Sequence, residues 1–237
     1  MPSLSQIPYR NHLLAALAPD DVARLEPHLE PVTLGVGDNL SVPNKPIEHV
    51  YFPESGIGSM VATTGEHRIE VGLFGRDGLS GTPLLLGSDR TPHEVFVQVA
   101  GQGLRMPSNA LREVVGQSPA LLGLLLRYVQ AFTVQTAYTA LSNGSENIEE
   151  RLARWLLMSH DRVDGDELPL THKFLSLMLG VQRTGVTLAL HVLEGAQVIS
   201  TRRGLITVVD RAKLEEVAGE SYGVPEAEYT RLIGPLH

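Results

Sequence analysis

Cysteine is absent from this chain of 237 residues, which excludes several kinds of chemistry at once. Without a thiol the chain has no disulfide, no thiolate zinc site, no cysteine-ligated iron–sulfur cluster and no cysteine nucleophile. The absence is typical of a reducing compartment, and we expect a cytoplasmic protein. Basic residues are also few, since 19 Lys and Arg face 27 Asp and Glu, which gives a net charge of −8.

The sequence also lacks a hydrophobic run long enough to enter a membrane. The first apolar run, residues 13–18, is short and leads into Pro19 and two aspartates rather than a cleavage site. Residues 118–145 carry one charged side chain, Arg127, but their threonines and glutamines make them too polar for a span of about 20 apolar residues. We therefore expect no membrane contact, and a helix here that is packed on more than one side.

Residues 31–107 are expected to form short antiparallel strands. Apolar runs such as 50–52, 69–74 and 95–99 are separated by glycines and prolines every few residues. This rhythm is typical of a β-roll or barrel. A short helix is expected before it, over residues 19–28, with two aspartates in its first turn.

After residue 117 the apolar period becomes helical. We expect one long helix over residues 118–141, followed by a break and a new helix that Asn143 caps. The second helix has one apolar face, formed by Ile148, Leu152, Trp155 and Leu156. Residues 161–167 are expected to be a polar linker.

Residues 171–199 predict two short helices joined by a tight turn. Thr171 is placed to cap the first helix, and Gly180 ends it. The second helix, from about residue 182 to 194, has one apolar face and one face that carries polar residues and a leucine. The apolar face comprises Val186, Ala189, Leu190 and Leu193, and the opposite face comprises Thr184, Thr187, Leu188 and His191, with Arg183 at its flank. These are the parts of a helix-turn-helix.

A basic hairpin follows the second helix. Two β-like runs, residues 198–201 and 205–209, flank Arg202, Arg203 and Gly204, as in a wing. Between residues 168 and 209, four basic side chains face one acid, so this segment is basic within an acidic chain and suited to DNA. From spacing alone, an ordinary helical hairpin with solvated arginines stays an alternative. A last helix is expected over residues 211–218, capped by Asp210.

The order of these parts resembles the Crp/Fnr family of bacterial transcription regulators over essentially the whole chain. Residues 37–40 and 50–56 are similar to the early strands of that family's roll, and residues 171–199 to its DNA-reading unit. The resemblance implies an α+β fold with an N-terminal antiparallel β-roll (double-stranded β-helix), a long dimerisation helix and a C-terminal winged helix-turn-helix. The implied domains are a sensor over 1–117, a dimerisation helix over 118–142 and a DNA-binding domain over 143–237.

The resemblance further implies a homodimer that binds double-stranded DNA at a roughly palindromic operator, with RNA polymerase as a further partner. Arg183 is suited to a bidentate contact with guanine, and Leu188 to a thymine methyl group. Thr184 and Leu188 stand where cyclic-AMP-responsive members have an acid and a second arginine, so we expect a different operator. The residues expected to bind DNA are Thr171, Lys173, Gln182, Arg183, Thr184, Thr187, Leu188, His191, Arg202 and Arg203.

The long helix is expected to pair with its counterpart in a second copy, which would explain why it has a single charge. Leu121, Leu125, Tyr128 and Phe132 follow at helical spacing and are the expected dimer contacts. The alternative is that this face packs only on its own β-roll.

Half of the cyclic-nucleotide cassette of that family is missing. In the family's nucleotide binders, a Gly-Glu pair holds the ribose and an Arg-Ser/Thr-Ala run holds the phosphate. Here Thr82 and Pro83 follow Gly81, so the carboxylate is absent, although Arg90 and Thr91 remain able to meet an anion. We expect no cofactor and an effector other than a cyclic nucleotide, with candidate effector contacts at Thr82, Arg90 and Thr91.

The competing functional class is an enzyme. A metal-dependent cupin would also use a glycine-rich roll, but the histidines here lack HxH spacing. Residues 219–223 match G-x-S-x-G but follow an expected helix rather than a strand. A haem ligated by His93, and a signalling module that does not bind DNA, are further alternatives. We expect no catalytic and no metal-binding residues.

Overall fold

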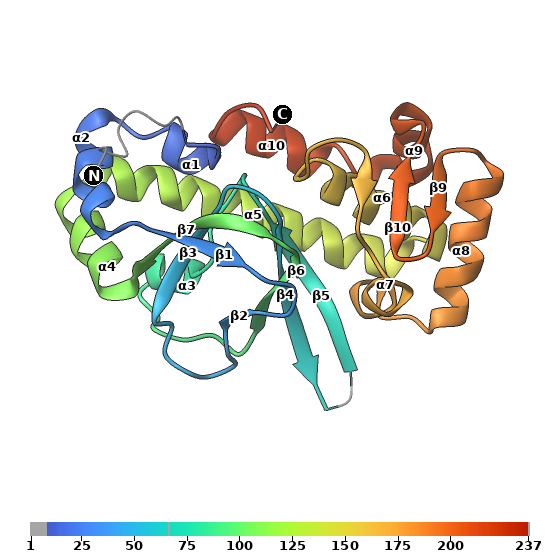
Figure 1. The fold of residues 1–237 in the computed structure, drawn as a ribbon, viewed down its shortest axis with the longest axis horizontal. Coiled ribbons are helices and arrows are strands. Elements are labelled where there is room, and N and C mark those ends of the chain that lie inside the picture. The colour runs from blue at the N-terminus through green and yellow to red at the C-terminus, as the bar shows by residue number, and fades with distance from the viewer. Residues whose placement is uncertain (1–8, 66, 237) are drawn as a thin grey trace.

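The computed structural model describes residues 9–65 and 67–236, which form an elongated molecule (Figure 1). The first half contains α1 (His12–Ala15), α2 (Pro19–Leu25), η2 (Glu26–His28), β1 (Glu30–Leu34), β2 (Asn39–Ser41), β3 (His49–Pro53), β4 (Ile57–Thr64), β5 (His67–Phe74), α3 (Thr82–Leu85), β6 (Glu94–Val99), β7 (Gly101–Pro107) and α4 (Ser108–Gln117). The second half contains α5 (Pro119–Ser145), α6 (Ile148–His160), β8 (Glu167–Leu168), α7 (His172–Leu179), α8 (Arg183–Gly195), β9 (Ile199–Arg202), β10 (Leu205–Val208), α9 (Arg211–Ala218), η3 (Gly219–Ser221) and α10 (Val224–Leu232).

The strands of the first half form the expected antiparallel β-roll. One sheet has the order β1-β7-β3 and the other the order β2-β6-β4-β5. Apolar side chains fill the space between them, namely Leu34, Leu40, Phe74, Val95 and Val97. Glycine allows β7 to come close to β3, because a Cβ on Gly103 would lie 2.6 Å from the carbonyl oxygen of Phe52. The predicted fold class, α+β with this roll and a winged helix-turn-helix, is confirmed.

The boundary between α5 and α6 differs from the prediction. α5 begins after its cap, Ser118, and continues through Asn143 to Ser145. The cap of α6 is Asn147, whose side chain accepts a hydrogen bond from the Glu150 amide at 3.0 Å, while the Glu150 carboxylate accepts one from the Asn147 amide at 3.0 Å. The prediction that Asn143 caps this helix is therefore wrong, and Asn143 instead accepts a hydrogen bond from Arg151.

The expected polar linker after α6 is only partly a linker. Asp161 and Arg162 are buried, and Arg162 forms an ion pair with Asp77 of the roll. Glu167 and Leu168 form β8, which pairs with β10 of the wing. The segment thus fastens the C-terminal half to the first half rather than separating the two.

The C-terminal segment also returns to the first half. α10 packs along α5, and Figure 1 shows it beside α1 at the upper edge of the molecule. Its Tyr229, with Leu236 beyond it, belongs to the apolar cluster under the roll, and Arg127 of α5 donates a hydrogen bond to the Leu232 carbonyl at 3.0 Å. The sequence analysis did not predict α10. None of the described helices combines the length and the apolar character needed to cross a membrane.

Candidate nucleic-acid interface

The turn between α7 and α8 has the geometry that the sequence predicts. The Thr171 hydroxyl accepts a hydrogen bond from the Phe174 amide at 3.3 Å and so caps α7. Gly180 ends α7 in the left-handed region, with φ of 62°, which a glycine adopts at little cost. Ser176 closes the turn by donating a hydrogen bond to the Val181 carbonyl.

α8 is fixed by its apolar face and presents the opposite face to solvent. Val186, Ala189, Leu190 and Leu193 are all buried, as predicted. Arg183, Thr184 and His191 are exposed. The outward face is therefore built of hydrogen-bonding groups held by a rigid helix, which is the arrangement needed to reach base edges in a major groove.

Two apolar side chains also lie on the exposed part of α8. Leu188 is 65% exposed and Val192, one turn later, is 54% exposed. The sequence analysis named Leu188 but missed Val192, although the spacing of four residues places both on one face. Exposed aliphatic groups beside polar ones are suited to the methyl groups of thymines.

Thr187 is less available for a DNA contact than the sequence analysis predicted. It is partly buried, and its hydroxyl donates to the Arg183 carbonyl at 3.0 Å and lies 3.2 Å from Nδ1 of His172. Sequence reasoning missed His172, which lies at the start of α7 and is exposed. The contact joins the first turns of the two helices.

The start of α8 has further capacity for an anion. Gln182 is exposed at the N-cap position, and its side chain makes no capping hydrogen bond. The first amides of a helix have no partner within that helix, so they attract phosphate. Lys173 is exposed on α7, the other helix of the motif.

The wing lies beside α8 and is fastened to it. β9 and β10 pair in register, and Arg202 and Arg203 are exposed at the hairpin. The Glu194 carboxylate at the end of α8 accepts hydrogen bonds from the Thr201 amide at 2.7 Å and from its hydroxyl at 2.6 Å. These bonds lower the pKa of Glu194, so the acid within the basic segment is engaged with the wing.

The dimer contacts predicted on α5 are contradicted by the packing of the chain on itself. Leu121 and Leu125 are each 1% exposed and Tyr128 is 2% exposed, all within the apolar cluster under their own roll. The fourth, Phe132, is partly buried and lies against Gly72 of β5, where an added Cβ would come within 2.6 Å of its ring. Side chains packed in this way present little surface to a second copy, so the alternative of packing on the own roll is the correct one for this face.

The candidate effector residues do not converge on a site. Thr82 and Thr91 are buried, and the Thr91 hydroxyl lies 2.9 Å from Nδ1 of His93. Arg90 is exposed and forms an ion pair with its neighbour Asp89 at 2.9 Å. Among the described residues, no group of three or more histidines or acids is arranged to hold a metal ion.

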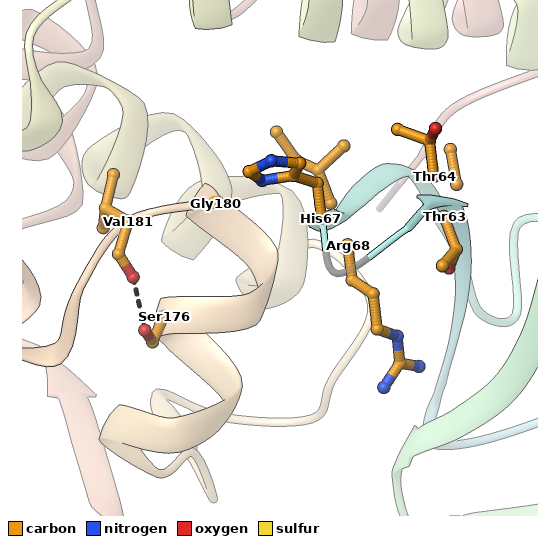
Figure 2. A pocket seen from close by; sticks show the side chains of 9 residues that line it. Thr63, Thr64, His67, Arg68, Ser176, Gly180 and Val181 are labelled. Carbon is orange, nitrogen blue, oxygen red and sulfur yellow. Dashed lines mark hydrogen bonds between the residues drawn. The ribbon is translucent and has the colours of Figure 1, made fainter.

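One cavity touches the helix-turn-helix itself. It has a volume of about 510 Å³ and lies between the ends of β4 and β5 and the turn after α7. Figure 2 shows Ser176, Gly180 and Val181 on one side of it and Thr63, Thr64 and Arg68 on the other. Arg68 pairs with Glu94, so the one arginine of this lining already has a counter-charge.

Comparisons with known proteins agree with this geometry. Residues 150–217 match the family described as the Crp-like helix-turn-helix domain. A search of curated proteins found no match. Among solved structures, FixK2 from Bradyrhizobium japonicum is similar with a TM-score of 0.67 and 15% identity, over 80% of this chain and 96% of that one.

Two further structures show the same likeness. A transcriptional regulator of the CRP/FNR family from Thermus thermophilus is similar with a TM-score of 0.65 and 20% identity, over 81% of this chain and 100% of that one. The c-di-GMP responsive global regulator CLP of Xanthomonas campestris has a TM-score of 0.63 and 17% identity, over 81% of this chain and 99% of that one. These likenesses establish the fold over both halves of the chain, and the family match adds a Crp-like helix-turn-helix domain over residues 150–217.

Proposed function

We propose that this chain, which has the fold of the Crp/Fnr regulators and a Crp-like helix-turn-helix domain at residues 150–217, is a sequence-specific DNA-binding transcription regulator. The observation that carries the proposal is the exposed face of α8, where Arg183, Thr184 and His191 lie beside an apolar pair. A basic wing flanks that face. The metal-dependent cupin alternative would need a cluster of ligands in the roll, and among the described residues no group of three or more histidines or acids is arranged to hold a metal ion.

The residues of the interface divide by chemistry into those that read bases and those that hold the backbone. Arg183 reads guanine through O6 and N7, and Leu188 meets a thymine methyl group, with Val192 as a neighbour. Thr184 and His191 serve as further base-edge contacts. The residues that position the phosphate backbone are Thr171, Lys173, Gln182, Thr187, Arg202 and Arg203.

A homodimer is part of the proposal, with a contact face different from the one first expected. α5 has an uncharged stripe that its own roll leaves half-exposed or exposed, formed by Leu122, Leu126, Val129, Thr133 and Ala140. In such a homodimer the two copies of α8 should enter successive major grooves about 34 Å apart. In this arrangement residues 1–117 act as sensor, 118–142 as dimerisation helix and 143–237 as DNA-binding domain, with RNA polymerase as a further partner.

The effector is proposed to be something other than a cyclic nucleotide. Thr82 is buried and supplies no carboxylate for a ribose, and Arg90 is engaged with Asp89 at the surface.

The experiment is a binding titration of purified protein with its footprinted operator and with random duplex, at several salt concentrations. Arg183→Ala should weaken operator binding by about 1–3 kcal/mol and relax discrimination at one base pair of each half-site. Arg202→Ala, the matched control on the wing, should weaken binding to both duplexes alike and reduce the salt dependence. Affinity for all duplexes that stays flat with salt would refute the interface.

A further inference from the structure

A buried carboxyl group lies between the β-roll and the helix-turn-helix domain. We call this contact surface the seam; it is formed by β4 and β5 of the roll against α6 and α7. Glu70 of β5 is 3% exposed there. Its carboxylate accepts a hydrogen bond from the Ser59 hydroxyl at 2.5 Å and another from Nε1 of Trp155 on α6 at 2.6 Å. One donor comes from each side of the seam, so the carboxyl group joins the two domains directly.

The rest of the seam is apolar. Residues of the roll, among them Val61, Leu73 and Phe96, share one continuous core with residues of α6, α7 and α8. The Phe96 ring stacks on that of Phe174, with ring centroids 6.4 Å apart. Sδ of Met178 lies 3.7 Å from the Ser59 hydroxyl. A charge on Glu70 would thus lie in surroundings that offer it two hydrogen bonds and little solvation.

The charged groups around Glu70 are occupied elsewhere. Among the described residues, Glu70 has no ion pair with any Lys, Arg or His. On α6, Arg154 donates to the Ser221 and Gln135 carbonyls and to the Thr139 hydroxyl, and Arg162 pairs with Asp77. These two arginines stabilise an ionised Glu70 only from a distance.

The remaining elements at the seam add no counter-charge at the carboxylate. The start of β5 carries His67 and Arg68, and Arg68 pairs with Glu94 of β6. His172 and Lys173 at the start of α7 are exposed. Gln135 of α5 is neutral, and its side-chain oxygen accepts the Leu73 amide at 2.9 Å.

Burial therefore dominates the protonation of this group. It raises the pKa of Glu70 to about 7, against the opposing effects of the hydrogen bonds from Ser59 and Trp155 and of the distant Arg162 and Arg154. An exposed glutamate titrates near 4.3, so the protonated form is favoured where the seam is closed and the ionised form where it is open. As pH rises from about 4.3, the pKa of an exposed glutamate, to about 7, the pKa of Glu70 in the closed form, the ratio of closed to open molecules falls by up to about tenfold for each pH unit.

We propose that Glu70 is a proton-dependent latch between the β-roll and the helix-turn-helix domain, closed when its side chain is protonated and released when the proton leaves. The proton departs to solvent and no covalent bond changes. Because α7 lies on β5 and joins α8 through a tight turn, release of the seam frees the orientation of α8. The latch itself stands on the seam; its consequence for DNA rests on the proposed function.

Trp155 is a direct reporter, since it is the only tryptophan of the chain and its indole donates to Glu70. The wild-type fluorescence should titrate between about pH 5 and 9 with a midpoint near 7. Glu70→Gln, which mimics the protonated group, should abolish that transition. Ser59→Ala removes a bond that favours the ionised form, so it should move the midpoint to higher pH. His160→Gln, a control for histidine titration on the same helix, should retain the transition.

Opening is measured separately by hydrogen–deuterium exchange of β5 and α7 at matched pH. Above pH 7 these segments should exchange faster in the wild type than in Glu70→Gln, and below about pH 4, where the glutamate is protonated in both the closed and the open form, the two should agree. A transition that survives in Glu70→Gln, an unmoved midpoint in Ser59→Ala, or equal exchange at all pH values would overturn the latch.

A DNA titration over the same pH range separates the two proposals. Affinity should depend on pH in the wild type and lose the Glu70-dependent part in Glu70→Gln. If the protein binds no duplex while the fluorescence transition follows Glu70, the DNA proposal fails and the latch stands. If duplex binding is specific but no Glu70-dependent transition exists, the latch fails alone.

Discussion

Arg162→Met tests how firmly the helix-turn-helix domain is tied to the roll. The Arg162 guanidinium and the Asp77 carboxylate are both 3% exposed, and their two hydrogen bonds measure 3.0 and 2.6 Å. Burial alone would disfavour the charge, but Asp77 raises the pKa of Arg162 above its usual value. Met fills the space of the arginine stem but leaves Asp77 buried with no cation.

Removing one partner of a buried ion pair destabilises a protein by about 3–5 kcal/mol, because the other charge stays uncompensated. For a chain of this size each kcal/mol lowers the melting temperature by about 2–4 °C. We therefore expect the melting temperature of Arg162→Met to fall by about 6–20 °C in a calorimetric or circular dichroism melt. A fall below about 3 °C would refute the reasoning.

Two further variants separate the pair from general damage. Asp77→Asn combined with Arg162→Met should lose less stability than Arg162→Met alone, since no unpaired charge remains and Asn keeps the acceptor for the Gly75 amide. The surface pair of Arg231 with Glu228 is the matched control. Arg231→Met removes a solvent-screened surface pair and should leave the melting temperature nearly unchanged.

The remaining predictions concern assembly and the effector. Leu126→Glu places a charge on the uncharged stripe of α5 and should convert a dimer to monomer in analytical ultracentrifugation, whereas the buried Leu125→Ala should lower stability by about 2–5 kcal/mol without changing the assembly. Unchanged sedimentation of Leu126→Glu would remove this stripe from the interface. Calorimetry with cyclic AMP and cyclic GMP should show no saturable heat, and tight binding of either would contradict the assignment of Thr82.

The winged helix-turn-helix could be predicted from sequence because α7 and α8 each have one polar, exposed face and one apolar, buried face. The period of α8 alone identified Val186, Ala189, Leu190 and Leu193 as buried, and all of them are. Gly180 predicted the turn because glycine readily adopts the left-handed conformation that ends a helix, and the structure has Gly180 in that conformation. Local chemistry of this kind needs no knowledge of the rest of the chain.

α5 could not be oriented in the same way. Its side chains are uncharged apart from Arg127, so the sequence shows no contrast between the face that meets the roll and the face that meets solvent. The candidate dimer contacts were therefore placed on the wrong side. The cap of α6 was misplaced for a related reason: Asn143 and Asn147 are each followed by a glutamate three residues later, and only the reciprocal bonds of Asn147 with Glu150 in the structure distinguish them.

Contacts between distant segments account for what was missed entirely. Glu70 and Trp155 lie 85 residues apart, and a glutamate between Ile69 and Val71 looks like one polar position of a strand. α10 docks through Tyr229, whose hydroxyl donates to the Asp77 carbonyl across 152 positions of sequence. No pattern in the sequence near Glu70 or Tyr229 predicts that their partners are Trp155 and Asp77.

The return of α10 to α5 means that the chain is not a set of interchangeable modules. The match to the helix-turn-helix family ends at residue 217, yet Tyr229 and Leu236 beyond it complete the apolar cluster under the roll. Consider a chimaera in which the helix-turn-helix domain of a relative replaces this one and the chain ends at that boundary. It would lack Tyr229 and Leu236, so the apolar cluster under the roll would contain a cavity. Grafts between such regulators should carry the C-terminal helix with the sensor it covers, not with the DNA-reading unit that precedes it.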